Sequence, residues 1–262
     1  MVMTLMPVVV IASLFGAVIG SFLNVCIYRL PRQESILWPA SHCTACGSTI
    51  AFYDNIPMIS YGILRGRCRA CRVSISIQYP LVELVTSIGY GLIFWHFGLT
   101  AVSFVYALLY SALVVITGTD FSHQIIPDMV TLPGLAIGIL SAAVILPLGI
   151  MNSLVGVVVG GGLLWLLAWL SPYLFGKEGM GGGDIKLMAM VGAFLGWKLV
   201  LLAIMVGSLL GSIVGVSLIA FRVMRRDQYL PFGPFLAVGS LVAIFLHQPV
   251  LNWYWSLFDG IP

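Results

Sequence analysis

The chain has 262 residues, of which 60% are hydrophobic and only 8% are charged, and its mean hydropathy is +1.08. Soluble globular proteins carry about 25% charged residues, so this chain has too few charges to cover a water-facing surface. The composition therefore excludes a disordered chain, a secreted disulfide scaffold and an ordinary cytosolic enzyme fold. It predicts an all-α polytopic membrane protein.

Long charge-free runs predict the membrane-spanning helices, because about 20 apolar residues cross a hydrocarbon core of roughly 30 Å. Residues 1–28 carry no charge and lack the basic start of a cleavable signal peptide, so we expect a retained first span. The runs 84–119 and 129–176 are each long enough for two helices. Breaks are expected near residues 96–98 and near Pro147 and Asn152.

Two more spans are expected at residues 199–221 and 231–258. The segment 185–197 is short for a span, and we expect a tilted or partly re-entrant helix that neighbouring helices protect. Counting this segment gives about eight transmembrane helices.

The distribution of basic residues predicts the orientation, because cytoplasmic loops carry an excess of Lys and Arg. With the N-terminus outside, eleven of the 12 Lys and Arg residues fall in inside loops, and only Lys198 lies outside. This orientation places the insertion at 26–80, Asp120, Asp128 and Asp184 on the cytoplasmic side. An alternative with seven spans would expose three C-terminal arginines to the outside: Arg222, Arg225 and Arg226.

The hydrophilic insertion contains two C-x-x-C pairs separated by 21 residues: Cys43 and Cys46, then Cys68 and Cys71. This spacing is close to that of zinc ribbons, in which two tight turns present four thiolates to one tetrahedral ion. Two disulfides are the alternative, but the cytoplasm keeps thiols reduced. The pattern predicts a structural zinc site, because four thiolates leave no coordination position open for chemistry.

These patterns divide the chain into a first transmembrane helix at 1–25, a zinc-binding insertion at 26–80 and a membrane-embedded bundle at 81–262. The six arginines of the insertion fit anionic lipid headgroups. Aromatic and basic residues are not interleaved there as in single-strand binding sites, so no nucleic acid partner is expected.

Glycines recur at four-residue spacing in several spans, which lets helix backbones approach closely in lipid. We expect these positions to form packing seams: Gly16, Gly20, Gly134, Gly138, Gly156, Gly160, Gly207, Gly211 and Gly215. No internal repeat suggests an inverted-repeat transporter.

Two carboxylates are candidates for catalysis. Asp120 closes the charge-free run that makes the third span, and Asp184 ends a glycine run directly before another apolar helix. Both are expected at the same membrane boundary, where ionisable groups are costly and usually functional. The alternative is that each caps a loop or helix end. Asp128, which follows Pro127, is favoured as a helix N-cap over a catalytic residue.

Paired carboxylates in a partly desolvated site share a proton, so that one remains a base while the other stays neutral. Aspartyl proteolysis uses this asymmetry: the ionised carboxylate takes a proton from water, and the neutral one hydrogen-bonds the scissile carbonyl. The glycines before Asp184 would let an extended substrate strand come close.

A series of motifs, in order along almost the whole chain, resembles the type IV prepilin peptidases of bacteria. They are G-S-F-L-N-V-C-I-Y-R-L-P at 20–31, the two C-x-x-C pairs, N-I-P at 55–57, R-G-R-C at 65–68, Q-Y-P-L-V-E at 78–83, Asp120 with I-P-D at 126–128, K-E-G-M-G-G-G-D at 177–184 and P-F-G-P at 231–234.

The resemblance implies a multi-pass intramembrane aspartyl protease of the GxGD type in the bacterial inner membrane. Asp184 would be the motif aspartate and Asp120 its partner, with five supporting residues: Gly181, Gly183, Lys177, Glu178 and Asp128. Its substrates would be prepilins or pseudopilins, cut at the cytoplasmic face between a short basic leader and an apolar helix. The cysteine module further implies methylation of the new N-terminal residue from S-adenosylmethionine, with no residues assigned to the donor.

Two functions from other classes compete with this one. A proton-coupled transporter would also use intramembrane carboxylates, but it leaves the cysteine pairs and the glycine run unexplained. A non-enzymatic membrane scaffold with a zinc ribbon leaves the carboxylates without a role.

Overall fold

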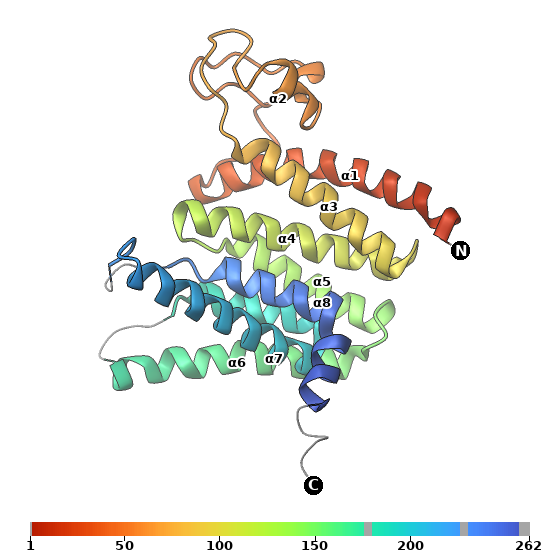
Figure 1. The fold of residues 1–262 in the computed structure, drawn as a ribbon, viewed down its shortest axis with the longest axis vertical. Helices are drawn as coiled ribbons and strands as arrows, with labels where there is room; N and C mark the ends of the chain where they lie inside the picture. The colour runs from red at the N-terminus through yellow and green to blue at the C-terminus, as the bar shows by residue number, and fades with distance from the viewer. Residues whose placement is uncertain (1, 176–179, 226–229, 257–262) are drawn as a thin grey trace. The chain divides into compact units, whose positions relative to one another are not determined.

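The computed structural model describes residues 2–175, 180–225 and 230–256, which form helices, loops and two isolated β-bridges (Figure 1). Lys177 and Glu178, two of the predicted supporting residues, lie outside the described residues. The helices in chain order are α1 (Val2–Arg29), η1 (Leu30–Arg32), η2 (Phe52–Asn55), α2 (Ile59–Ile63), α3 (Gln78–Phe97), α4 (Ala101–His123), α5 (Asp128–Val144), α6 (Gly149–Phe175), α7 (Gly182–Ala220) and α8 (Gly233–Ser256).

Five of these helices are long and apolar enough to cross a membrane, namely α1, α3, α4, α6 and α7, and two shorter apolar helices are α5 and the 233–249 part of α8. Helix α7 has 39 residues, which would run about 58 Å if straight, nearly twice the thickness of a bilayer core. It is not straight, because Gly196 has φ 75° and ψ 174° and separates residues 182–195 from 197–220. The described residues thus form eight apolar helical segments, which confirms the predicted fold class.

The predicted breaks between helices are also confirmed. Helix α3 ends at Phe97, and Gly98 follows with φ 68°, a left-handed conformation that glycine adopts without steric cost. Helices α5 and α6 are separated by residues 145–148.

The contacts divide the chain into two compact units, residues 1–119 and 120–262. In the first unit α1 packs against α3 through the predicted glycine seam. A methyl group on Gly16 would lie 2.8 Å from Tyr90 Cβ, and one on Gly20 would lie 2.7 Å from Glu83 Cα. The cysteine-bearing insertion extends from the place where α1 ends and α3 begins (Figure 1). The three-part functional division of the sequence stays a prediction.

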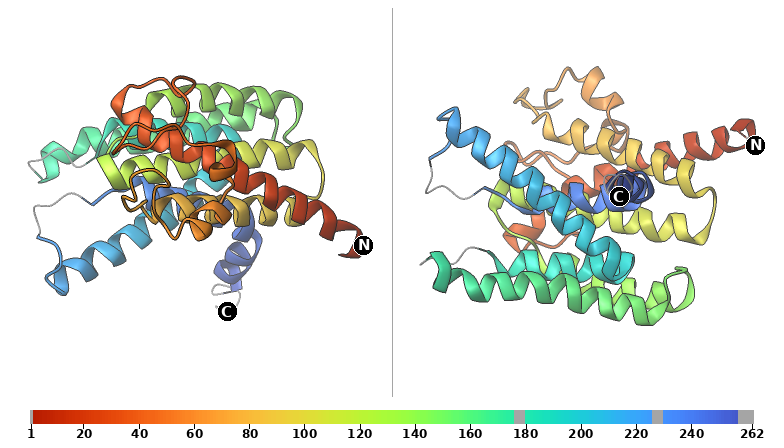
Figure 2. Two further views of the ribbon diagram at one scale, coloured as in Figure 1. Left: turned by 90° about the horizontal axis from the view of Figure 1, so that it is seen from above. Right: turned by 60° about the horizontal axis from the view of Figure 1, so that its bottom comes forward.

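In the second unit α7 lies at the centre and packs against α5, α6 and α8, and Figure 2 shows α6 and α7 side by side. Nearly every residue from Leu187 to Gly196 is buried, as expected for a short helix protected by its neighbours. Side chains on Gly156 and Gly160 of α6 would collide with the α7 backbone, which confirms that seam.

Candidate active site and metal centre

The four predicted zinc ligands lie together in the first unit. The sulfur atoms of Cys43, Cys46, Cys68 and Cys71 are all within 4.8 Å of one another, and the Sγ atoms of Cys43 and Cys71 are 3.8 Å apart. Four thiolates at a Zn–S distance of about 2.3 Å form a tetrahedron whose edges measure about 3.8 Å. All four are free thiols. The cluster therefore has the donor set and the dimensions of a structural zinc site.

Each cysteine pair is presented by a tight turn. In the first turn the Cys43 N–H donates to Ser48 O at 2.9 Å, and the Gly47 N–H donates to Cys43 O at 2.8 Å. Gly47 takes φ 71°, and a side chain there would meet no atom within 4 Å. Glycine is therefore favoured at this position by its backbone conformation and not by lack of space.

The second turn repeats the first one 25 residues later. The Cys68 N–H donates to Val73 O at 2.9 Å, and the Arg72 N–H donates to Cys68 O at 3.1 Å. Arg72 occupies the position of Gly47 and takes φ 60°, which is unfavourable for a residue with a Cβ. The two pairs are thus offered to one ion by equivalent turns, as in a zinc ribbon.

The thiols of Cys46 and Cys71 have shifted pKa values, and the two shifts are in opposite directions. A hydrogen bond with the Ser48 hydroxyl lowers the pKa of Cys46 to about 6. The pKa of Cys71 is raised to about 11; its bond with the Val73 backbone lowers it, but burial and the neighbouring sulfur atoms outweigh that bond. A divalent cation among the sulfur atoms would replace these protons and cancel the repulsion between thiolates.

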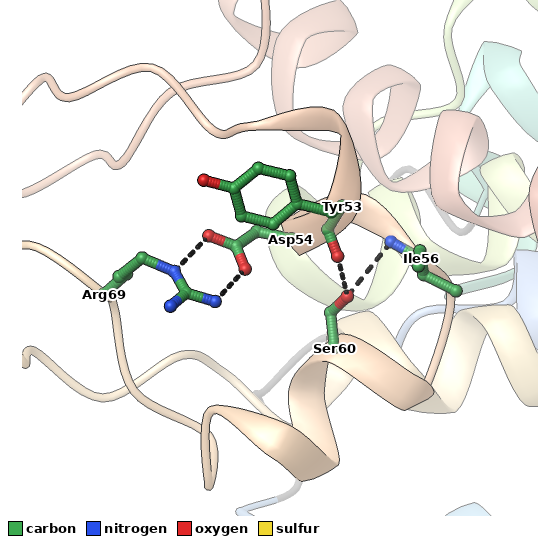
Figure 3. A network of polar contacts seen from close by, with 5 residues as sticks. All are labelled: Tyr53, Asp54, Ile56, Ser60 and Arg69. Carbon is green, nitrogen blue, oxygen red and sulfur yellow. Dashed lines mark hydrogen bonds and ion pairs between the residues drawn. The ribbon is translucent and has the colours of Figure 1, made fainter.

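An ion pair ties the two halves of the module together (Figure 3). Arg69 donates from Nε and Nη2 to the two carboxylate oxygens of Asp54, at 2.6 and 2.5 Å. The Arg69 guanidinium thereby holds the pKa of Asp54 below its usual range. Beside it, the Ser60 hydroxyl donates to Tyr53 O and accepts from the Ile56 N–H, so that α2 is fastened to η2.

Asp120 lies in the last turn of α4, in the second unit, and is 6% exposed. Its Oδ2 accepts a hydrogen bond from the N–H of Gly233, the first residue of α8, at 2.9 Å. The carboxylate thus sits at the positive end of the α8 dipole, which favours a negative charge. A methyl group on Gly233 would lie 2.8 Å from Asp120 Oδ2, so only glycine permits this approach.

Asp184 lies in the first turn of α7 and is half-buried. Gly181 is the N-cap of α7, and Asp184 donates its N–H to Gly181 O at 3.2 Å. A methyl group on Gly181 would lie 3.8 Å from Asp184 Oδ2, so the carboxylate faces the glycine run. Asp184 thus lies at the N-terminal end of its own helix, whereas Asp120 lies at the C-terminal end of α4 and contacts the N-terminal end of α8.

Ile126 joins the two aspartate positions. A methyl group on Gly183 would lie 2.8 Å from Ile126 Cβ, and one on Gly233 would lie 3.4 Å from Ile126 Cδ1. The start of α7, with Asp184, and the start of α8, which binds Asp120, therefore both pack against this one side chain.

Asp128 is not a helix N-cap, which corrects the favoured interpretation. It is the first residue of α5, the N-cap is Pro127, and no side chain caps this helix end. Both Asp128 carboxylate oxygens instead lie 2.7 Å from Lys186 Nζ on α7. Since Asp128 is 55% exposed and paired with a cation, its environment differs from those of Asp120 and Asp184.

Sequence reasoning missed three residues of this region: Gly233, Ile126 and Lys186. The first two lie in the quoted P-F-G-P and I-P-D motifs, whose unusual Gly and Pro content could have indicated a close backbone approach. Lys186 follows Asp184 by two residues, and no sequence signal links it to α5.

Fold and sites together define a polytopic membrane protein with four cysteines positioned to bind a metal ion and two aspartates held at helix ends. Residues 14–97 match the model of the bacterial peptidase A24 N-terminal domain, and residues 107–216 match that of the type IV leader peptidase family. No solved structure matches the chain.

Curated relatives match over nearly their full length. A protein of Pseudomonas putida is 36% identical over 90% of both chains, and one of Pseudomonas aeruginosa is 36% identical over 92% of this chain and 91% of its own. A Neisseria gonorrhoeae relative is 34% identical over 93% of both chains. Each is named prepilin leader peptidase/N-methyltransferase. The chain belongs to the type IV leader peptidase family and is a multi-pass membrane peptidase.

Proposed function

We propose that this protein cleaves the basic leader from prepilins or pseudopilins with Asp120 and Asp184 as a catalytic pair, and then methylates the new N-terminal residue. The observation that carries the peptidase mechanism is the arrangement around Ile126. The starts of α7 and α8 both pack against this side chain. At the start of α8 the Gly233 N–H binds the Asp120 carboxylate, and at the start of α7 the Asp184 carboxylate lies beside Gly181. The names of the curated relatives support the substrate and the second activity.

In this mechanism the two carboxylates share one proton, because like charges at short range cannot both ionise easily. The ionised aspartate takes a proton from water as the water oxygen attacks the scissile carbonyl. The neutral aspartate donates a hydrogen bond to the carbonyl oxygen and stabilises the charge that develops there. The Gly233 N–H holds Asp120 in place throughout.

Substrate access is supported by the exposure of the glycine run. Gly181 and Gly182 are exposed, and a side chain on Gly182 would meet no atom within 4 Å, so there is open space beside the start of α7. An extended peptide could lie against this backbone within reach of Asp184. We propose that Lys177, Glu178 and Asp128 are supporting residues of the peptidase site. We also propose that cleavage takes place on the cytoplasmic side of the inner membrane.

The metal centre has a structural role in this proposal. Zinc bound by Cys43, Cys46, Cys68 and Cys71 would hold the two turns together and supply folding free energy to a module with little apolar core. Four sulfur ligands leave no position for substrate, so the ion takes no part in proteolysis.

The methyl donor is proposed to be S-adenosylmethionine, which supplies a methyl group carried on a cationic sulfur. The donor is a co-substrate and not a resident group, because it is consumed when its methyl group is transferred.

The test is to incubate the detergent-solubilised protein with a prepilin and labelled S-adenosylmethionine and to analyse the product by mass spectrometry. The proposal predicts a shortened pilin that then gains one labelled methyl group on its N-terminal residue. An uncut prepilin would refute the peptidase function and leave the transporter or scaffold. A cut but unlabelled pilin would refute only the methyl transfer.

A further inference from the structure

A second buried carboxylate lies in the first unit, and the proposed peptidase does not use it. Glu83 is in the second turn of α3 and is only 8% exposed. Its Oε2 accepts the Met58 N–H at 2.7 Å. Met58 belongs to the cysteine-bearing insertion, so this contact joins the insertion to α3.

The surroundings of Glu83 are polar although they lie between two apolar helices. Gly20 brings the α1 backbone against Glu83 Cα. Asn24, only 4% exposed, donates from Nδ2 to Tyr79 O at 3.0 Å, and the Ser21 hydroxyl lies 3.4 Å from Asn55 Oδ1. We call Ser21, Asn24, Asn55 and Glu83 the α1–α3 polar cluster.

In the part of the chain that the structure describes, no ion pair supplies a countercharge to the carboxylate of the α1–α3 polar cluster. The ion pairs found among the described residues join Arg69 to Asp54 and Lys186 to Asp128, and neither includes Glu83. Arg29 is buried and follows Asn24 of the cluster by five residues on α1. Its guanidinium, however, donates to the carbonyls of Ser35 and Pro39. A buried carboxylate that only neutral groups contact is costly unless a cation binds it.

The carboxylate also has acceptor capacity to spare. An ionised carboxylate offers about four lone-pair positions, and the contact with the Met58 N–H takes up one of them. A cationic ligand could therefore bind Glu83 without displacing this contact.

We propose that methyl transfer takes place at the α1–α3 polar cluster, with the Glu83 carboxylate as the countercharge of a cationic reactant. The inference rests on the proposed methyl transfer and assigns it to a different unit from the peptidase pair. The reaction has two cationic groups that fit: the α-ammonium of the cleaved pilin and the sulfonium of the donor.

The α-ammonium suits the chemistry of a carboxylate directly. Its pKa is about 7.7 to 8.0, so it is mostly protonated at neutral pH and must lose a proton before it can react. Glu83 would accept that proton. The nitrogen lone pair then forms the bond to the methyl carbon as the carbon–sulfur bond breaks and its electron pair stays on sulfur. The product is an N-methylammonium group and a neutral thioether.

The experiment compares wild-type protein with Glu83→Gln and with Glu34→Gln, an exposed carboxylate of the same unit, as matched control. The amide of Glu83→Gln keeps the size of the side chain and can still accept the Met58 N–H. We expect cleavage of a prepilin within twofold of wild type and methylation at least tenfold lower, while Glu34→Gln behaves like wild type in both. Binding of S-adenosylmethionine and of its neutral product S-adenosylhomocysteine is measured on the same proteins.

Binding distinguishes the two cations. Weaker binding of S-adenosylmethionine alone places the donor sulfonium at Glu83, and unchanged binding of both compounds places the pilin amine there. The assignment is overturned by a methylation loss below tenfold, by equal weakening of both compounds, or by a parallel loss of cleavage. Wild-type protein that cleaves without methylating would overturn the assignment together with the proposed methyl transfer, and the cleavage result would stand.

Discussion

Replacing Gly233 by alanine tests the contact that holds Asp120 in place. The added methyl group would lie 2.8 Å from Asp120 Oδ2 and 3.3 Å from its Cγ. Ordinary van der Waals contact begins near 3.4 Å, so the carboxylate and the start of α8 must separate by about 0.6 Å. The hydrogen bond from the Gly233 N–H, now 2.9 Å long, would then exceed normal length.

The expected loss follows from the value of that bond. A hydrogen bond to a charged group contributes about 1.5 to 3 kcal/mol, and each 1.4 kcal/mol lost in the transition state lowers a rate about tenfold. Since the bond positions a carboxylate proposed to do chemistry, we expect Gly233→Ala to reduce kcat/KM for prepilin cleavage by about 10- to 100-fold.

The assay is time-resolved cleavage of a purified prepilin by solubilised protein, with Gly162→Ala as control. Gly162 lies in α6 of the same unit, and a side chain there would meet no atom within 4 Å, so that variant should keep wild-type activity. Thermal unfolding of both variants checks that the fold is retained. Full activity of Gly233→Ala would show that the placement of Asp120 by α8 does not matter for cleavage.

Four further predictions concern the metal centre and the charges around the aspartates. Elemental analysis should find about one zinc per chain, and Cys46→Ser should lower this content and loosen the insertion more than the membrane helices; metal-free wild-type protein would refute the site. Arg72→Gly should slow the loss of zinc to a chelator and Gly47→Ala should speed it, because both positions have positive φ. Each substitution should change the stability of its turn by about 1 kcal/mol. Rates of zinc loss equal to that of the wild type would refute the equivalence of the two turns. Asp54→Asn should speed zinc loss at pH 7, because the lowered pKa of Asp54 keeps it ionised and paired with Arg69 at that pH. The ion pair is lost only as the pH falls through that lowered pKa, below about 4. An unchanged rate of zinc loss at pH 7 would contradict a role of the ion pair in holding the zinc. Cleavage should have a bell-shaped pH profile, because the active form of a carboxylate pair carries one proton. The neighbouring charges of Asp128 and Lys186 neutralise each other. A profile that stays flat from about pH 4, near the reference pKa of a carboxyl group, up to about pH 9 would contradict a shared proton.

Much of the fold could be predicted because lipid imposes simple rules on sequence. Charge-free runs located the helices, and Gly98 and the segment 145–148 separate helices where breaks were expected. The two segments of α7 agree with the helices expected at 185–197 and 199–221. The residue that separates them, Gly196, was not predicted, because glycines that form packing seams give the same sequence signal as one that bends a helix.

The metal centre was predictable because four ligands at fixed spacing determine their own geometry. The aspartates were less so. Their position near helix ends followed from the sequence, but the contact of Asp120 with the Gly233 N–H joins residues 113 positions apart. The pairing of Asp128 with Lys186 was missed because the two residues are far apart in the sequence. In addition, an aspartate that follows a proline fits both a helix N-cap and an ion pair.

The most direct test of the catalytic pair is the cleavage rate of Asp120→Asn, Asp184→Asn, the double variant and Asp128→Asn. Asparagine keeps the shape of each side chain, and at position 120 it can still accept the Gly233 N–H, so folding should be retained. Because the pair acts as one unit, each single change should abolish cleavage and the double variant should be scarcely worse. Asp128→Asn loses only an exposed ion pair, worth about 0.2 to 1 kcal/mol, and should keep most of its activity. Loss of cleavage in Asp128→Asn with retention in Asp120→Asn would contradict the pair and make Asp128 the partner of Asp184.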